Sequence, residues 1–347
     1  KEYRIHACEK ALAWVAALIL IFQPWALGGM RLGSQIVVGV LALIAFVIAL
    51  LPRNYSDEHH AGQAFRLKTW PKLIRFPIFW IGIIYFGIIF TQIANPAWRY
   101  VSTDLGWWLR AIDYIKWLPH GVADTPALMM NGWRTILIQG AAWLLICALW
   151  IGITRRKTAR ILITTIALNG VAIALTILAQ RLIGADKLLW LLKVGPSYFA
   201  GSFIYKNHAG AFLILIIALC MGLAWSHAVR AEQRLKKSHP GMLFVLLAII
   251  STVALLLTYA RAATILGGGA GILVAMGYGV RLVFRKSNGQ RNIVTAITSL
   301  AGLGFIIFFG AIFDAEKAYG KFERLNNEEK FRSITIRQVA AKATLEM

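Results

Sequence analysis

Residues 32–51 read LGSQIVVGVLALIAFVIALL, a run of twenty positions without a charged side chain. A helix needs about 20 predominantly apolar residues to cross the roughly 30 Å hydrocarbon core of a bilayer. Lipid offers no hydrogen bonds to the backbone, so a spanning segment must satisfy its N–H and C=O groups internally, as a helix does. The stretch therefore predicts a transmembrane helix.

Eight further stretches also lack Asp, Glu, Lys and Arg and are similarly apolar. They cover residues 11–27, 76–94, 136–153, 161–178, 209–226, 241–259, 262–280 and 293–313. The chain is 59% hydrophobic and only 15% charged, and its mean hydropathy is +0.65, which excludes an ordinary soluble globular protein. The strands of a membrane barrel alternate at every second residue, and these stretches do not. We expect an all-α, polytopic integral membrane helix bundle with about nine transmembrane helices.

The net charge is +22, from 37 Lys and Arg residues against 15 Asp and Glu residues. In a soluble protein this excess would suggest nucleic acid as a partner. Here the cations lie between apolar blocks, so the expected partner is the lipid bilayer and no nucleic acid. Cytoplasmic loops are enriched in Lys and Arg, and the short loops richest in cations face inward if the N-terminus is cytoplasmic. The first apolar stretch reads as a retained helix, because no small-residue cleavage site follows it.

The outer loops keep a cationic surplus that this topology does not explain. Before residue 314 they hold ten Lys and Arg residues against four Asp residues. Arg31 and Arg261 are each the only cation of a tight outer hairpin, where a charge near the membrane is costly unless it snorkels or binds something. Either role, snorkelling to the interface or binding a ligand, would account for these arginines. A diphosphate is a suitable ligand, because the guanidinium fork can hydrogen-bond it at two points.

Lys206, Asn207 and His208 open the sixth apolar stretch. They are either a polar helix start with Asn207 as its N-cap, or an ammonium, an amide and an imidazole at the outer mouth of the bundle. No cluster of His, Cys, Asp and Glu has metal-ligand spacing, and neither the adjacent His59 and His60 nor the glycines near 267–271 form a convincing site. We expect no metal and no cofactor.

Two segments of the outer loops are predicted to lie in the membrane interface. Residues 104–118 read DLGWWLRAIDYIKWL, with apolar residues at helical spacing. This pattern favours an interfacial periplasmic helix, either as an aromatic anchor or as a platform for a lipid-borne substrate. Residues 187–193, KLLWLLK, are the second such segment.

Three segments carry a resemblance to a known family. Residues 197–223, SYFAGSFIYKNHAGAFLILIIALCMGL, are similar to a helix start of pattern GxF-x-N-x-N-H-x-A-x-F-L, and residues 258–271, TYARAATILGGGAG, are similar to a turn of pattern S-x-S-R-(G/A)-(A/S). Residues 323–343 look like the beginning of a large periplasmic loop. In this order and spacing, the chain resembles the O-antigen ligase and polymerase superfamily of integral membrane glycosyltransferases.

The resemblance implies a GT-C-like architecture in the bacterial inner membrane with a periplasmic active site. It implies an inverting, metal-independent glycosyltransferase that moves a glycan from an undecaprenyl-diphosphate carrier to an acceptor, with lipid A–core favoured. A repeat polymerase or a protein O-oligosaccharyltransferase is the alternative within the family. The domain organisation would be an N-terminal transmembrane region at 1–196 with five helices, a ligase-like core at 197–313 with four, and the start of the periplasmic loop at 314–347.

The same resemblance suggests the site residues. Arg261 would bind the donor diphosphate and Arg31 the same anion, and His208 is the candidate base within the chain. The family's catalytic histidine would lie beyond Met347, and Tyr259-Ala260 replaces the family serine before the arginine. The further candidate substrate-binding residues are Lys206, Asn207, Tyr259, Arg332 and Arg337.

A polysaccharide or lipid transporter and a non-catalytic membrane scaffold are the alternatives from other classes. Transporters are marked by internal repeats, broken helices and charges at mid-membrane. The apolar stretches show no clear repeat and contain no Asp or Glu, and Pro24 and Pro77 are their only candidate breaks. These features favour the enzyme.

Overall fold

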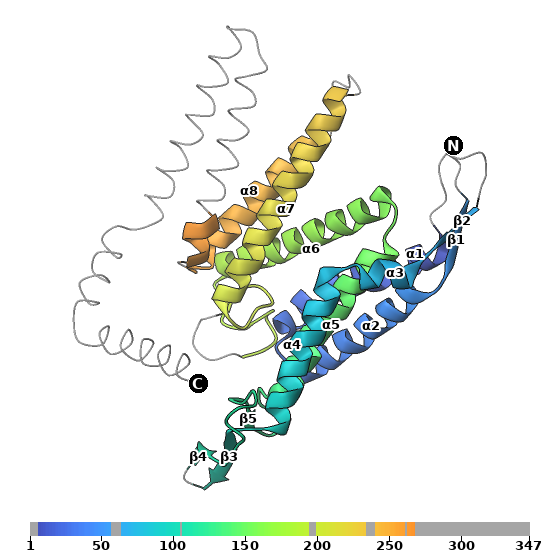
Figure 1. Cartoon of the computed structure of the whole chain (residues 1–347). Helices are drawn as coiled ribbons and strands as arrows, with labels where there is room; N and C mark the ends of the chain where they lie inside the picture. Colours follow the sequence, from blue (N-terminus) through green and yellow to red (C-terminus); the bar gives the residue numbers. More distant parts are fainter. Residues whose placement is uncertain are drawn as a thin grey trace. The chain divides into compact units, whose positions relative to one another are not determined.

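The computed structural model describes residues 6–56, 64–104, 106–193, 199–233, 240–260 and 262–267 (Figure 1). The chain divides into two units, Lys1–Gly267 and Gly268–Met347, and all described residues belong to the first. The helices of this part are α1 (Ala7–Trp25), η1 (Leu27–Gly29), α2 (Leu32–Leu50), α3 (Thr69–Ile74), α4 (Pro77–Ala94), α5 (Gly132–Gly152), α6 (Arg156–Ile183), α7 (Lys206–Gln233) and α8 (Gly241–Leu257). The strands are β1 (Arg53–Ser56), β2 (Ala64–Leu67), β3 (Trp98–Thr103), β4 (Gly106–Ala111) and β5 (Ala123–Asp124).

Six described helices are long and apolar enough to cross a membrane. They are α1, α2, α4, α5, α6 and α7, and α8 is a shorter apolar helix of 17 residues. The prediction of a mostly helical, membrane-embedded chain is confirmed. The eighth predicted stretch reaches the described residues only at 262–267, which are helical, and the ninth at 293–313 lies outside them. The count of nine spans therefore stays a prediction, as do the boundaries at 196 and 313.

Local sequence explains where several helices begin and end. The Asn131 side chain accepts the N–H of Arg134 at 2.8 Å and caps the start of α5. Pro77 occupies the first turn of α4, where its missing N–H costs nothing. Gly184 ends α6 in the left-handed region at φ 67°, which suits a residue without a Cβ. The candidate breaks at Pro24 and Pro77 thus lie near helix ends, and neither interrupts a span.

α2 and α5 pack closely through small residues. Ala42, Ala45 and Ala49 of α2 are fully buried, as are Cys147 and Ala148 of α5. Large apolar residues point the other way, and Val40, Leu43 and Val47 of α2 are each about half exposed. Small residues at the contact and large ones outside are the arrangement expected in lipid, where helices associate by close packing.

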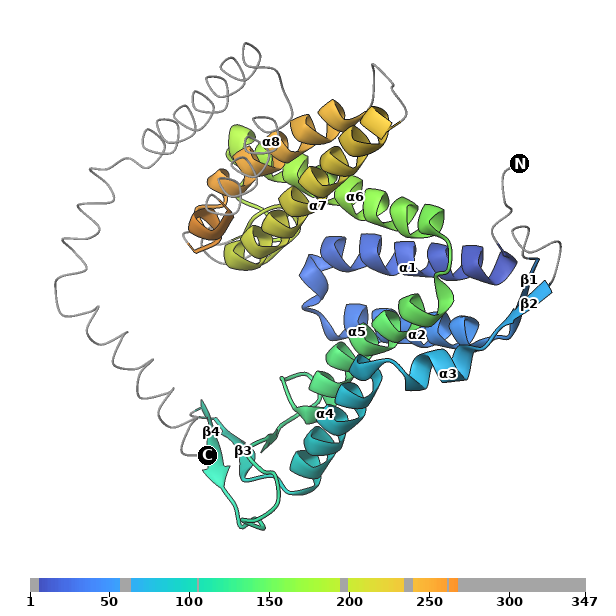
Figure 2. The same cartoon turned by 45° about the horizontal axis from the view of Figure 1, so that its top comes forward.

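α6, α7 and α8 pack on one another and form two buried clusters (Figure 2). One cluster joins Ile173 and Ile177 of α6 to Leu213 of α7 and Leu255 of α8. Gly170 of α6 lies against Ile216 of α7, where a Cβ would overlap the isoleucine side chain. α1 contacts α6, and the Trp25 indole N–H donates to the Asn169 side chain at 2.7 Å.

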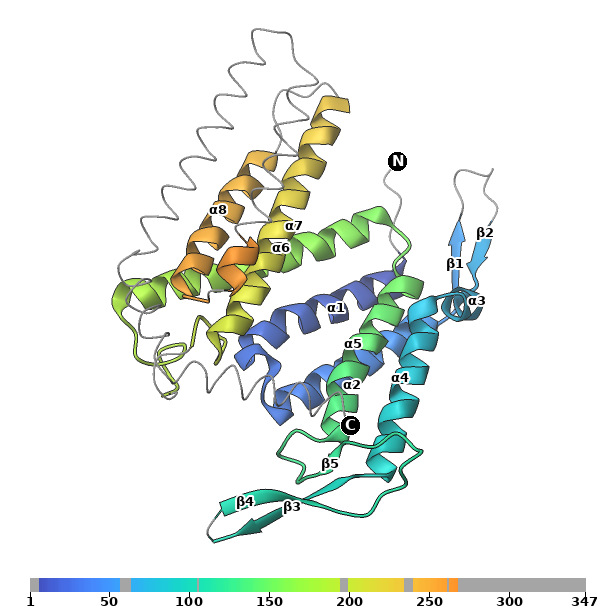
Figure 3. The same cartoon turned by 60° about the vertical axis from the view of Figure 1, so that its left-hand side comes forward.

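The interfacial helix predicted at 104–118 is wrong. β3 and β4 instead form an antiparallel hairpin in which Trp98 pairs with Ala111 and Thr103 with Gly106, and β5 runs parallel to β3 (Figure 3). The six residues of β3, WRYVST, are β-branched or aromatic at four positions, and this strand provides the pairing partner that the helical spacing of 104–118 does not reveal. The segment 187–193 consists of turns closed by a Leu188–Leu192 bridge.

Candidate functional site

The described helices alternate in direction, so that α1, α4, α6 and α8 end where α2, α5 and α7 begin. We call this the Arg31 end, and the other, where α1, α4 and α6 begin, the Lys72 end. Hydrogen bonds show that the end of α1, the end of α6 and the α6–α7 connection lie together at the Arg31 end. The Ser202 hydroxyl donates to the Pro24 carbonyl at 2.7 Å, and the Gln180 side chain exchanges hydrogen bonds with the Gly201 backbone.

Arg31 lies at the N-cap of α2 with extended backbone. Its carbonyl accepts from the Ser34 hydroxyl and from the Gln35 N–H, whereas its side chain is exposed and has no acidic partner among the described residues. The backbone around Arg31 is therefore fixed while its guanidinium is accessible. This is the property that an anion-binding residue needs.

Arg134 explains why the backbone near Arg31 is fixed, although no motif or spacing in the sequence singles it out. Its guanidinium donates to the Gln35 side chain at 2.7 Å, to the Leu128 carbonyl at 2.8 Å and to the Met30 carbonyl at 2.6 Å. The Gln35 amide in turn donates to the Gly29 carbonyl at 2.9 Å. Arg134 is thus a structural residue that satisfies backbone carbonyls, and it does not belong to the outer cationic surplus available to a ligand.

The loop before α7 packs against the α1–α2 connection. Phe203 lies so close to Gly28 that a Cβ on that glycine would be 2.6 Å from the ring. Gly28 also has φ 66°, so any other residue would be strained there. Leu27, Leu188 and Phe199 are buried together beside these contacts. The hairpin that precedes Arg31 and the loop that leads to Lys206 are therefore held to one another.

α7 begins at Lys206, so Asn207 lies in the first turn and is not the N-cap. Asn207 and His208 are exposed and Lys206 is half-buried. The His208 ring lies 5.8 Å from the Tyr205 ring, and the His208 N–H donates to the Tyr205 carbonyl. The ring contact and backbone hydrogen bond of His208 in the described part of the chain do not involve Arg31.

Tyr259 lies under a cation that sequence reasoning missed. The Arg181 guanidinium, at the end of α6, lies 5.6 Å from the centre of the Tyr259 ring and donates to the Phe199 carbonyl at 3.3 Å. The only signal for Arg181 in the sequence is that it is the first cation after the apolar stretch at 161–178. The predicted site residues Arg261, Arg332 and Arg337 lie outside the described residues.

The described non-glycine residues with positive φ all belong to the connections at the Arg31 end. They are Leu27 at 59°, Leu189 at 50°, Trp190 at 61° and Tyr259 at 54°. Such backbone costs on the order of 1–3 kcal/mol per residue and is concentrated at functional sites in known proteins. No group of three or more His, Cys, Asp or Glu lies together in the described part, and the expectation of a metal-free site stays a prediction.

The Lys72 end has a different, buried polar network. The Glu9 carboxylate of α1 accepts the N–H groups of Thr154 and Arg155 and the hydroxyls of Thr154 and Thr158, and so ties α1 to the turn that leads into α6. Arg53 is 1% exposed and donates to the Gly152 and Ile48 carbonyls at the ends of α5 and α2. α1 begins before the apolar stretch at 11–27 and thereby includes Glu9.

Comparison of the chain with protein family models, with curated proteins and with solved structures finds no match.

Proposed function

We propose that the chain is an inverting glycosyltransferase that moves a glycan from an undecaprenyl-diphosphate carrier to an acceptor, with lipid A–core as the favoured acceptor. Its site would lie at the Arg31 end, which would face the periplasm from the bacterial inner membrane. The proposal includes nine transmembrane helices in a GT-C-like bundle with a cytoplasmic N-terminus. The predicted topology and the motif resemblance of residues 197–223 and 258–271 suggest this assignment.

One observation carries the proposal. The two segments that bear the resemblance are far apart in the sequence, yet Ala200 and Ala209 from the first and Ala260 from the second belong to one buried cluster. Trp25, at the end of α1, packs against the same cluster. Asn207 and His208, which precede Ala209, and Tyr259, which precedes Ala260, are exposed. A site assembled from these motifs requires this kind of convergence.

The chemistry that these groups suit is a direct displacement at the anomeric carbon. The acceptor oxygen bonds to this carbon from one face while the bond to the lipid diphosphate breaks on the other, which inverts the configuration. The bonding electron pair leaves with the diphosphate, and the acceptor proton passes to a base. Arg261 and Arg31 would stabilise the departing anion, and removal of one such donor typically costs about 10²–10³ in rate.

His208 is the candidate base within the described residues, because its imidazole is exposed at the first turn of α7. The family resemblance implies a second candidate, a histidine outside the described residues. The two assignments make different predictions. His208→Asn abolishes transfer if His208 takes the proton, and leaves most of the activity if the other histidine does.

The test is a transfer assay with the full chain reconstituted in proteoliposomes. The donor is an undecaprenyl-diphosphate-linked glycan, and lipid A–core, a second repeat unit and a serine peptide are offered as separate acceptors. We expect transfer to lipid A–core and a loss of about 10²–10³ in rate for Arg261→Ala. Lys193→Ala, which removes a cation from the same group of loops, is the matched control and should keep the wild-type rate.

Transfer to the repeat unit or to the peptide alone would replace the favoured acceptor by one of the family alternatives. Wild-type rates in Arg261→Ala would contradict the site. Movement of the intact carrier-linked glycan across the bilayer without any new glycosidic bond would contradict the enzyme and indicate a transporter.

A further inference from the structure

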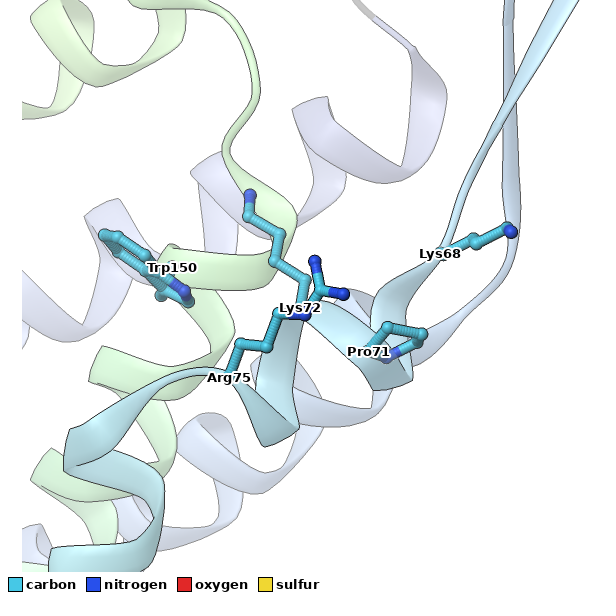
Figure 4. Close-up of a pocket in the computed structure, with 5 residues that line it drawn as sticks. All are labelled: Lys68, Pro71, Lys72, Arg75 and Trp150. Atoms are coloured by element: carbon cyan, nitrogen blue, oxygen red, sulfur yellow. The ribbon is translucent and has the colours of Figure 1, made fainter.

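A cationic groove lies at the Lys72 end, opposite the end that carries Arg31. It has a volume of about 580 Å³ and is lined by Lys68, Pro71, Lys72, Arg75 and Trp150 (Figure 4). Three of these five residues are cations and none is acidic. Figure 4 shows the Lys72 and Arg75 side chains between the Trp150 ring and Lys68. A concave surface of this charge suits an anion.

The residues of the groove are held in place by packing. α3 buries Thr69 and Leu73, and Leu73 joins a cluster with residues of α1, α2 and α5. The Phe76 ring stacks on the Trp150 ring with centroids 4.6 Å apart. The wall that carries Lys72 and Arg75 and the wall that carries Trp150 are therefore connected, and the groove is largely formed before any ligand binds.

The positive charge of the groove is not cancelled within the described part of the chain. Lys72 donates to the Ile151 carbonyl at 3.4 Å, and its ammonium lies 5.9 Å from the Trp150 ring centre. Lys68 and Arg75 are exposed and have no acidic partner among the described residues. Glu9 attracts Lys72 electrostatically, but the Glu9 oxygens accept hydrogen bonds from Thr154, Arg155 and Thr158.

The surroundings of the groove are apolar and aromatic. Trp70 and Ile74 of α3 are more than half exposed, and the half-exposed Trp80 of α4 donates its indole N–H to the Ile74 carbonyl at 2.8 Å. Tryptophan side chains are enriched at membrane–water interfaces. α4 begins two residues after Arg75, and its exposed face continues through Ile81 and Ile84, which are 63% and 64% exposed. An apolar path thus leads from the groove along a membrane-spanning helix.

We propose that this groove binds the headgroup phosphate of an anionic phospholipid, whose acyl chains lie along the exposed face of α4. Arg75 and Lys72 would contact the phosphate, and Lys68 would add charge at the rim. Basic pockets between transmembrane helices bind anionic headgroups in other membrane proteins. A free phosphate would use only the cations, whereas a phospholipid also explains the exposed isoleucines of α4. The proposal is independent of glycan transfer, because it concerns the opposite end of the helices.

The test is lipid retention by the purified full chain in a mild detergent, measured by native mass spectrometry. Dioctanoyl phosphatidylglycerol is the probe, dioctanoyl phosphatidylcholine tests the need for net negative charge, and inorganic phosphate tests the need for acyl chains. We expect retention of phosphatidylglycerol at concentrations where the other two are not retained. Each cation near a headgroup contributes about fivefold in affinity, so Lys72→Gln with Arg75→Gln should weaken retention about 25-fold.

Two further variants keep the test decisive. Lys68→Gln with Arg75→Gln changes only exposed side chains, so it should fold normally and still weaken retention. Lys187→Gln with Lys193→Gln removes the same charge at the Arg31 end and should retain the lipid as the wild type does. Equal retention by all variants, or equal binding of phosphatidylcholine, would overturn the proposal. Binding of inorganic phosphate as tight as that of phosphatidylglycerol would also overturn it.

Discussion

Both ends of the described helices combine a buried or bonded arginine with exposed cations, but they differ in how the surrounding backbone is packed. At the Lys72 end, Arg53 is buried on the carbonyls of Gly152 and Ile48, and the adjacent groove is built on a well-packed short helix. At the Arg31 end, Arg134 holds the loops together, while Arg31 remains exposed among connections with strained backbone. The comparison teaches that a basic loop in a membrane protein contains two kinds of cation. Some satisfy backbone carbonyls, and others are accessible to an anionic ligand.

The largest effect on stability is expected for Glu9→Ala. Four donors from Thr154, Arg155 and Thr158 would lose their acceptor in a buried site, and each such loss costs about 1–3 kcal/mol before relaxation. We expect the free energy of unfolding in detergent to fall by about 3–5 kcal/mol, as measured by denaturant titration. Glu9→Gln keeps one acceptor oxygen and should lose less. An unchanged unfolding midpoint in Glu9→Ala would mean that this carboxylate does not hold α1 to α6.

The second prediction contrasts the two arginines of the Arg31 end. Arg134→Ala removes three hydrogen bonds and should lower the free energy of unfolding by about 2–3 kcal/mol. Arg31→Ala should change it by less than about 0.5 kcal/mol, because the side chain is exposed, yet it should reduce glycan transfer. Thermal unfolding and the transfer assay on both variants check this difference. A stable, fully active Arg31→Ala would remove Arg31 from the site.

The helices were predictable because their apolar stretches are as long as a bilayer is thick, and local sequence alone carries that information. The β3–β4 hairpin was not predictable in this way, because Trp108, Leu109 and Ile112 fit a helical period. The strand that contains two of them forms only by pairing with residues 98–103, and that pairing is not visible in the local pattern. Arg31 was predicted as an outer hairpin cation. The structural role of Arg134 was not predicted, because one of its acceptors, the Met30 carbonyl, lies 104 residues away in the sequence.

The third prediction concerns the pH dependence of the groove. Burial is the main cause that lowers the pKa of Lys72 below its usual 10.5; the charge of Arg53 also lowers it and Glu9 raises it. As the pH rises through this lowered pKa, the ammonium loses its charge and phosphatidylglycerol retention should fall about fivefold. Retention measured between pH 7 and 10 checks this. Lys72→Arg keeps its charge across this range and should give a flat profile, with Lys68 and Arg75 as the remaining cations.

The same shift affects stability in a defined direction. Between the lowered pKa and 10.5 the unfolded chain binds more protons at Lys72 than the folded chain does. The free energy of unfolding contributed by this group therefore rises with pH in that window. A contribution that falls with pH there would contradict the buried environment of Lys72.

The smallest effect is expected for the ion pair of the β-hairpin region. The Arg99 Nε and Asp124 Oδ2 atoms are 3.8 Å apart, and both side chains are more than half exposed. Exposed pairs of this kind contribute about 0–1 kcal/mol, so Asp124→Asn should leave the unfolding midpoint nearly unchanged. A loss comparable to that of Arg134→Ala would show that the pairing of β3 with β5 depends on this contact.

The most direct test of the central claim is a transfer assay that compares Arg261→Ala with a double variant at the Lys72 end. Arg261→Ala and the double variant Lys72→Gln with Arg75→Gln are reconstituted with the same carrier-linked donor and lipid A–core acceptor. We predict that Arg261→Ala loses about 10²–10³ in rate while the double variant stays within a few-fold of the wild type. Full activity in Arg261→Ala, or loss of transfer only in the double variant, would contradict a transfer site at the Arg31 end.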